Sequence, residues 1–205
     1  LSSANKKSLQ HLMNVSFKNA FIPSIWKESI IIPLLKPGKT EEDPNSYRPV
    51  ALTSCLSKAM ERLIANRLHW FLETKSKINI DQAGFRRGCS TMDHIIRLES
   101  AIKSSFSKKC STVAVYLDIS KAYDSVWTQG LLYKMAELGI TGHILTWTKN
   151  FLTGRTMSVR IGNQLSTAKE VENGVPQGAA LSPILFNIML SDFPNHRPNI
   201  KTMLF

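Results

Sequence analysis

The start of the chain shows two short extended segments. The apolar run 29–35 predicts a strand, and the Lys-Pro-Gly-Lys sequence at 36–39 predicts a turn directly after it. Residues 47–52 are also expected to be extended, because Pro49 biases the backbone of Arg48 away from helix. The pattern therefore predicts two extended segments, separated by a turn and an acidic loop.

Two helical stripes follow these segments. Apolar side chains recur at helical spacing over 56–72, which is the strongest helical pattern in the sequence. The charged side chains fall on its other faces: Lys58, Glu61, Arg62 and Glu73. A second helix is expected to begin at Ser90, where the sequence is like a capping box, and to continue to Phe106.

The second half of the chain mixes both kinds of element. The β-branched and apolar run 112–117 predicts a buried strand that carries Asp118 at its C-terminal end. Alternation over 156–161, followed by Gly162 and Asn163, predicts a hairpin. Helices are expected to end near Gly139 and Gly154, and another to span about 181–190. Because strands and helices do not alternate strictly, the sequence favours an α+β fold.

Composition narrows the class of protein. A hydrophobic share of 43% and a charged share of 20% are typical of a globular chain and exclude a disordered one. The formal net charge is +11, of which +9 lies in residues 1–110, so the first half is expected to face a polyanion. The longest apolar stretches are too short or too broken to cross a bilayer, and the first residues lack the order of a signal peptide. The sequence therefore predicts an intracellular protein without a membrane partner.

The cysteines point to no chemistry of their own. Cys55, Cys89 and Cys110 are odd in number and widely spaced, which argues against a disulfide framework or a zinc site.

Asp118 is the stronger candidate for a metal ligand, because an acid at the end of a buried strand can project into a cleft and bind a hard divalent cation. The alternative is a structural aspartate that caps the next helix, with Lys121 as its partner.

Two longer strings point to one family. Residues Tyr116-Leu-Asp-Ile-Ser-Lys-Ala-Tyr-Asp-Ser-Val126 resemble motif A of the reverse transcriptases of non-LTR, LINE-type retrotransposons. Residues Gly174-Val-Pro-Gln-Gly-Ala-Ala-Leu-Ser-Pro183 resemble motif B of the same enzymes. The resemblance covers the chain from about Ile22 to its last residue, and the jockey-like branch is our hypothesis for its place in the family.

The resemblance implies roles for motif A. Asp118 would be the catalytic acid and a ligand of two Mg²⁺ ions, or Mn²⁺, and the main chain of Ile119 would also help to bind metal. Tyr123 would be the aromatic residue that excludes the ribose 2′-hydroxyl, because a ring packed under C2′ leaves no room for another oxygen. Asp124, the usual second acid of this motif, is interpreted as structural.

Motif B would bind the substrate. Gln177 and Gly178 are the expected contacts, since an amide can hydrogen-bond the substrate and a glycine lets it approach the backbone. Ala179 departs from the family, which often has Ser or Thr there, so a hydroxyl contact is not expected.

Basic residues ahead of motif A resemble the finger motifs of the family. Arg48, with Lys36 and Lys39 as weaker candidates, is expected to bind the triphosphate of the incoming nucleotide. Solvated surface charge is the alternative for each lysine. Arg86 and Arg87 lie in a segment that also resembles the fingers, and from their charge we expect them to hold template phosphates without reading bases.

Motif C of the family consists of an aromatic residue, an alanine and two aspartates. Phe205 matches the aromatic residue, and both aspartates fall beyond the end of the sequence. We therefore expect a C-terminally truncated fragment that is inactive alone, because one carboxylate cannot hold two metal ions in the arrangement that in-line displacement requires.

The expected whole is the fingers and an incomplete palm of a right-hand polymerase. The expected division is an upstream helical or linker region (1–21) and a partial reverse transcriptase domain (22–205), with fingers (22–110), palm (111–128 and 166–205) and an insertion (129–165). The parent protein would be an RNA-directed DNA polymerase that takes an RNA template, a DNA primer and dNTPs, and it would act in the nucleus if it primes on nicked chromosomal DNA. Its oligomeric state is open. The alternatives are a non-catalytic nucleic-acid-binding or domesticated remnant and, nearer, a group II intron-type or telomerase-type polymerase.

Overall fold

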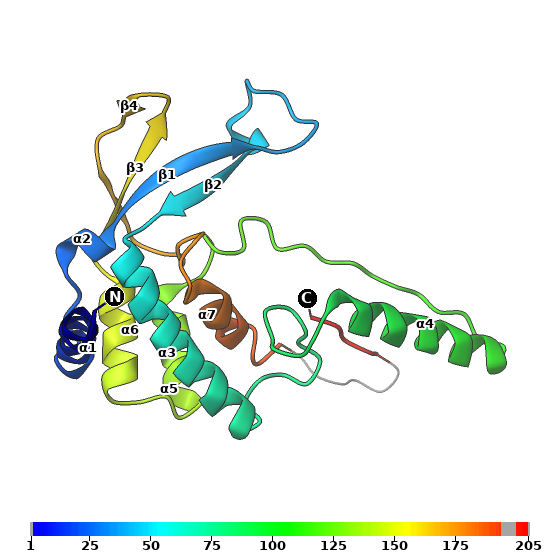
Figure 1. Ribbon diagram of the computed structural model, residues 1–205. Helices are drawn as coiled ribbons and strands as arrows, with labels where there is room; N and C mark the ends of the chain where they lie inside the picture. The colour runs from blue at the N-terminus through cyan, green and yellow to red at the C-terminus, as the bar shows by residue number, and fades with distance from the viewer. Residues whose placement is uncertain (1, 194–199, 205) are drawn as a thin grey trace.

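A base of packed helices carries a small sheet above it (Figure 1). The computed structural model describes residues 2–193 and 200–204. Its helices are α1 (Ser3–Lys18), α2 (Ser24–Lys27), α3 (Cys55–Thr74), α4 (Thr91–Ser107), α5 (Thr128–Glu137), α6 (His143–Leu152) and α7 (Ser182–Met189), with a 3-10 turn at Pro44–Ser46. Its strands are β1 (Glu28–Leu35), β2 (Tyr47–Leu52), β3 (Arg155–Ile161), β4 (Gln164–Leu165) and β5 (Lys169–Val171). The chain thus combines helices with strands, as the sequence predicts.

The sheet is mixed and has β1 and β3 at its centre. Its order is β2-β1-β3-β4, and β5 also pairs with β3. β1 runs antiparallel to β2, with Ile31 opposite Ala51, and parallel to β3, with Glu28 opposite Thr156. The two extended segments expected near the start of the chain are therefore confirmed as neighbouring strands, and the hairpin expected after position 156 is confirmed as β3 and β4.

The hydrophobic core lies among α3, α5, α6 and α7. Leu131, Met135 and Leu185 are fully buried there, and the rings of Trp147 and Phe151 stack with centroids 5.4 Å apart. Burying a leucine or phenylalanine side chain contributes roughly 1.5–3 kcal/mol, so this cluster is the main source of stability. The helices expected from the apolar stripes are confirmed at α3 and α7, and none of the described helices is long and apolar enough to cross a membrane.

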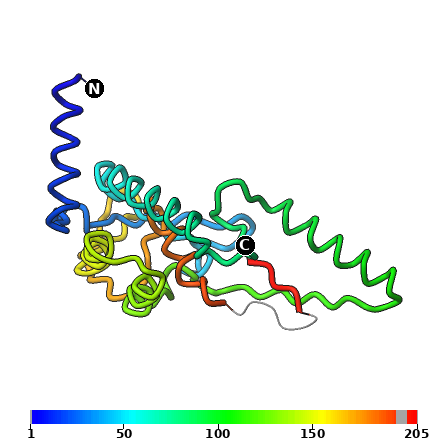
Figure 2. The backbone as a smooth tube through the Cα atoms, turned by 90° about the horizontal axis from the view of Figure 1, so that it is seen from below, coloured from blue at the N-terminus to red at the C-terminus, as the bar shows by residue number. Residues whose placement is uncertain are grey.

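Helix α1 contacts this base through its C-terminal end. The Trp147 indole Nε1 donates a hydrogen bond to the Ser16 hydroxyl over 3.0 Å, and the Asn150 amide donates to the Ala20 carbonyl over 2.8 Å. Both bonds join α6 to the end of α1 or the turn after it. The end of α1 and the turn after it are therefore packed against α6, whereas residues 2–8 of α1 are exposed and the start of the helix projects away from the base (Figure 2).

Helix α4 projects away from the base, and the chain after it runs back as an extended segment (Figures 1 and 2). The expected capping box is confirmed at Ser90, whose side chain and backbone both pair with Asp93 at the third helical position. No residue of α4 is buried, although Ile95, Ile96 and Phe106 are apolar. This helix presents its apolar positions to solvent.

The buried strand predicted at 112–117 is wrong. Val113, Tyr116 and Leu117 are 85%, 81% and 82% exposed, and residues 111–119 form neither helix nor strand. A strand needs a neighbour to pair its backbone groups, and none of the described strands lies beside this segment. Asp118 consequently lies on an exposed segment instead of at the edge of a sheet.

We predict fast amide exchange along residues 111–119. No backbone hydrogen bond joins this segment to another part of the described chain, so its amides should exchange at least about 100-fold faster than those of α6. Hydrogen–deuterium exchange measured by mass spectrometry on the 205-residue protein tests this. Protection equal to that of α6 would contradict the exposed conformation.

Candidate functional site

The loop 174–182 is where the segments with predicted roles meet. The Gly174 amide donates to the Val126 carbonyl over 2.8 Å, and the Val175 amide donates to the Tyr123 carbonyl over 2.9 Å. On the other side, the Ala51 amide of β2 donates to the Gln177 carbonyl over 2.8 Å. Backbone bonds therefore join the loop both to the segment after Asp118 and to the strand that carries Arg48.

Two positions of this loop require glycine. Gly174 and Gly178 have φ angles of +90° and +114°, which residues with a side chain rarely adopt. A Cβ at 178 would lie 2.8 Å from the Ala51 carbonyl oxygen, and one at 174 would lie 3.0 Å from the backbone of Asp124. The glycines thus allow the close packing of the loop between the two neighbouring segments.

Glu61 also reaches this loop, and its expected place on a polar face of α3 is wrong. Its side chain is fully buried, and its Oε2 accepts a hydrogen bond from the Ala180 amide over 2.7 Å. Its Oε1 accepts a second bond from the Ser57 hydroxyl over 2.8 Å. Each carboxylate oxygen therefore has a donor in a place closed to water.

Tyr123 is half-buried in an aromatic cluster. Its ring centroid lies 5.5 Å from that of Phe186 and 6.5 Å from that of Phe85. Burial raises the pKa of the Tyr123 phenol, so the side chain is neutral at physiological pH. Phe85 itself has a positive φ of 55° and is 55% exposed, so it forms an open aromatic edge of this cluster. Sequence analysis assigned Phe85 no role.

The basic residues of the first hairpin are spread along it. Arg48 is exposed on β2, three residues before the Ala51 contact with the loop. Lys36 lies at the turn end of the hairpin, where its Nζ donates to the Asn45 carbonyl over 2.8 Å, and Lys39 is exposed in the turn. Of the three, only Arg48 is on the strand that contacts the loop directly.

The two adjacent arginines have different surroundings. Arg86 donates from Nε and Nη2 to both carboxylate oxygens of Glu73, over 2.7 and 2.8 Å. Hydrogen bonding to Glu73 raises the pKa of the Arg86 guanidinium and lowers the pKa of the Glu73 carboxyl. Arg87 is exposed and donates to the Asn66 side chain over 2.7 Å. Arg86 is engaged within the protein, and Arg87 is the more accessible positive charge.

A buried amide network fixes the segment before these arginines. The Asn187 amide of α7 and the Gln82 amide both donate to the Gly84 carbonyl, over 3.0 and 3.1 Å. The Gln82 amide also lies 3.3 Å from the Asn187 side-chain oxygen. The sequence analysis did not predict this role of Asn187. The signal was available, because an amide side chain within the apolar pattern of α7 needs a buried hydrogen-bond partner.

The metal-binding residues expected from motif A do not gather into a metal site by themselves. Asp118 and Ile119 are both exposed, and within residues 2–193 and 200–204 no three His, Cys, Asp or Glu side chains are close enough to hold a metal ion. The described residues therefore do not fit a pair of divalent cations. Phe205, the expected start of motif C, lies outside the described residues, and Leu204 before it forms a parallel bridge to Gln82.

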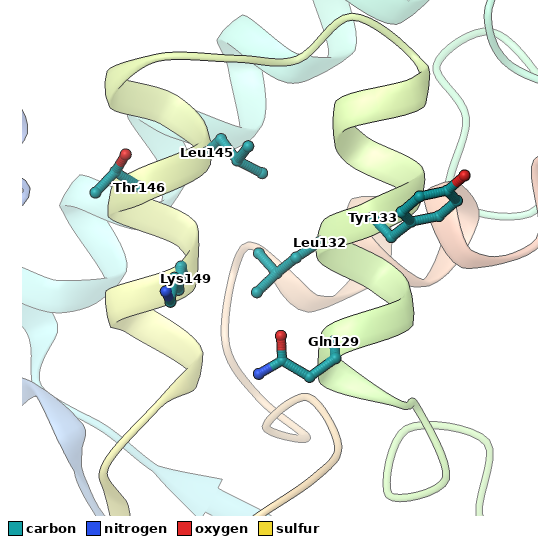
Figure 3. Close-up of a pocket in the computed structure, with 6 residues that line it drawn as sticks. All are labelled: Gln129, Leu132, Tyr133, Leu145, Thr146 and Lys149. Atoms are coloured by element: carbon teal, nitrogen blue, oxygen red, sulfur yellow. The ribbon is translucent and has the colours of Figure 1, made fainter.

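A separate pocket lies between α5 and α6 (Figure 3). It has a volume of about 470 Å³ and is lined by Gln129, Leu132, Tyr133, Leu145, Thr146 and Lys149. None of the site residues predicted from the sequence lines it. The candidate site is therefore the surface around the loop 174–182.

Comparison with known proteins identifies the family of this chain. Residues 34–205 match the family described as reverse transcriptase (RNA-dependent DNA polymerase). The chain is 38% identical over 183 residues to the probable RNA-directed DNA polymerase from transposon BS of Drosophila melanogaster. It is also 38% identical over 178 residues to the RNA-directed DNA polymerase from mobile element jockey of the same species.

These alignments cover most of this chain and a small part of each relative. They include 89% and 87% of the chain but 20% and 19% of the two relatives, so the chain spans about a fifth of their length. The family match includes both strings that resemble motifs A and B. The chain therefore belongs to the reverse transcriptase family, and the relatives that it resembles include the polymerases of jockey and other mobile elements.

Proposed function

We propose that this chain forms the fingers and part of the palm of an RNA-directed DNA polymerase of a non-LTR retrotransposon. The observation that carries the proposal is the loop 174–182, whose backbone joins the Tyr123 segment to β2. In this proposal residues 22–110 are mainly fingers, residues 111–128 and 166–205 belong to the palm, and residues 129–165 are an insertion. The family match and the names of the relatives support the polymerase activity.

The proposed reaction extends a DNA primer on an RNA template. The primer 3′-hydroxyl gives up its proton to water, and its oxygen attacks the α-phosphate of a dNTP to form a new phosphodiester bond. The bond from the α-phosphorus to the oxygen that bridges to the β-phosphate breaks, and pyrophosphate leaves with the electrons of that bond. Arg48 would neutralise phosphate charge, and Gln177 and Gly178 would position the substrate. Tyr123, held half-buried by Phe186, would be the surface that excludes a ribose 2′-hydroxyl.

The proposed reaction needs divalent cations, and the described residues do not supply enough carboxylates to bind them. Divalent cations, when bound, would stabilise the negative charge that develops on the phosphate oxygens, and they need several oxygen ligands. Asp118 would supply one carboxylate, and the described residues supply no cluster that completes the site. We therefore propose that Asp118 acts only when further carboxylates are brought beside it.

Template and primer would bind through positive charge. The first 110 residues carry a net charge of +9, and phosphate backbones bind such surfaces without sequence preference. Arg87 is exposed and is the better candidate for a template phosphate, because Arg86 is already paired with Glu73. This binding would weaken as salt concentration rises.

The first test of the proposal is primer extension. We expect the 205 residues alone to give no product above an Asp118→Ala control with Mg²⁺ or Mn²⁺ on an RNA template, because the metal ligands are incomplete. A longer polypeptide that joins these residues to a complete motif C should extend the primer, and Asp118→Ala should abolish that activity. Extension by the longer polypeptide that survives Asp118→Ala would contradict the proposal.

The second test concerns sugar selection. In the longer polypeptide, Tyr123→Val should lower the preference for dNTPs over rNTPs by at least about tenfold in kcat/KM, because it removes the ring that fills the space of the 2′-hydroxyl. Tyr123→Phe should keep the preference, since the ring remains.

Tyr133→Val is the matched control for this test. Tyr133 is 66% exposed on α5 and lines the separate pocket between α5 and α6, so sugar preference should not change. Equal preference in wild type and Tyr123→Val would show that Tyr123 does not select the sugar.

A further inference from the structure

A buried carboxylate lies directly behind the candidate substrate loop. Glu61 has no exposed surface, and both of its oxygens accept hydrogen bonds, one from Ser57 and one from the Ala180 amide. The bond to Ala180 joins residues that are 119 positions apart in the sequence. Glu61 thus connects α3 to the loop through a single backbone amide.

This arrangement is energetically costly unless the carboxylate has a specific partner. A charged group removed from water is destabilising when it lacks donors, whereas a well-packed apolar side chain carries no such cost. Arg155, at the start of β3, is also buried, and its positive charge is close enough to interact with Glu61. Burial lowers the pKa of Arg155 to about 10, and the negative charge of Glu61 opposes that shift.

The contacts hold the exposed tip of the loop from two sides. On one side the Ala51 amide binds the Gln177 carbonyl at 2.8 Å, and on the other the Glu61 carboxylate binds the Ala180 amide at 2.7 Å. Gly178 lies between these two contacts and is the exposed residue of the tip. The backbone of Gly178 is therefore fixed at both ends, while its own surface stays open to a ligand.

We propose that Glu61 is a positioning residue, whose buried carboxylate holds the Ala180 amide and so sets the conformation in which Gln177 and Gly178 meet the nucleotide. This inference rests on the proposed function, because it assigns the loop to nucleotide binding. Glu61 does not touch the substrate in this proposal and acts only through the loop. The feature that this role requires is an acceptor oxygen at the end of the side chain of residue 61.

Local amide exchange of the 205-residue protein tests the positioning role without any activity measurement. Glu61→Met keeps the length of the side chain but removes the acceptor, so amides within 176–182 should exchange about tenfold faster. Glu61→Gln keeps an acceptor oxygen and an amide that can donate to Ser57, and exchange should stay within about threefold of wild type. Amides of α5 and α6 should be unchanged in both variants.

Glu73→Gln is the matched control. It replaces the same residue type on the same helix, but the carboxylate of Glu73 pairs with Arg86 instead of with an amide of the loop. It should therefore leave exchange at 176–182 unchanged. Wild-type exchange at 176–182 in Glu61→Met, or equal loosening of α5 and α6, would overturn the positioning role.

A second measurement covers the case in which Glu61→Met does not fold. In the wild type, the Ala180 amide proton should resonate far downfield in the NMR spectrum, because hydrogen bonds to a charged acceptor are short and strong. In Glu61→Gln the acceptor is neutral, and the resonance should move upfield. An unchanged Ala180 resonance in Glu61→Gln would overturn the proposal.

The kinetic consequence is measured separately in the longer polypeptide that extends primers. Glu61→Met should raise the KM for dNTP about tenfold with a smaller change in kcat, and Glu61→Gln should restore the KM to near the wild-type value. Faster loop exchange in Glu61→Met together with an unchanged KM would overturn the link to the nucleotide. If the wild-type polypeptide extends no primer but Glu61→Met still speeds amide exchange at 176–182, the proposed function is contradicted, whereas the positioning of the loop by Glu61 is supported.

Discussion

The backbone hydrogen bonds of the loop 174–182 are the constraint on which the candidate site depends. They connect segments that are far apart in sequence, since one set reaches Tyr123 and Val126 and another reaches Ala51 on β2. Buried backbone donors and acceptors must be paired, so the loop and its two neighbours can only be placed together. That requirement places the Tyr123 segment and the strand that carries Arg48 beside Gln177 and Gly178.

Two features of the sequence make the hydrogen bonds of the loop possible. Glycine at 174 and 178 provides the left-handed backbone and the space against Asp124 and Ala51 that a side chain would occupy. Glu61 provides an acceptor for an amide that no strand or helix partner serves. The site thus combines residues without side chains, which allow close approach, with one buried charged side chain, which fixes the approach.

The exposed segment that carries Asp118 shows the opposite situation. Its β-branched and apolar composition is that of a buried strand, yet it has no strand partner among the described residues and stays exposed. Composition records which environment a segment prefers, whereas a sheet forms only when a second strand supplies the hydrogen bonds. The nearby Tyr123 is held in place without that sheet, because its ring packs on Phe186 and its carbonyl accepts a hydrogen bond from the loop.

The sequence by itself determined the elements with local causes. The periodic stripe of α3, the capping box of α4 and the Gly-Asn turn of the β3–β4 hairpin depend on neighbours within a few residues. The roles that the family resemblance implies for Tyr123 and Gln177 stay predictions. Only the tertiary structure decided that Glu61 is buried against Ala180 and that Arg86 is paired with Glu73. In α3 the polar residues Ser57 and Glu61 share the helical spacing of Ile64 and Leu68, which was the available signal. The Ala180 amide that Glu61 binds is 119 positions away, and helical periodicity reports the buried face of a helix but not what packs against it.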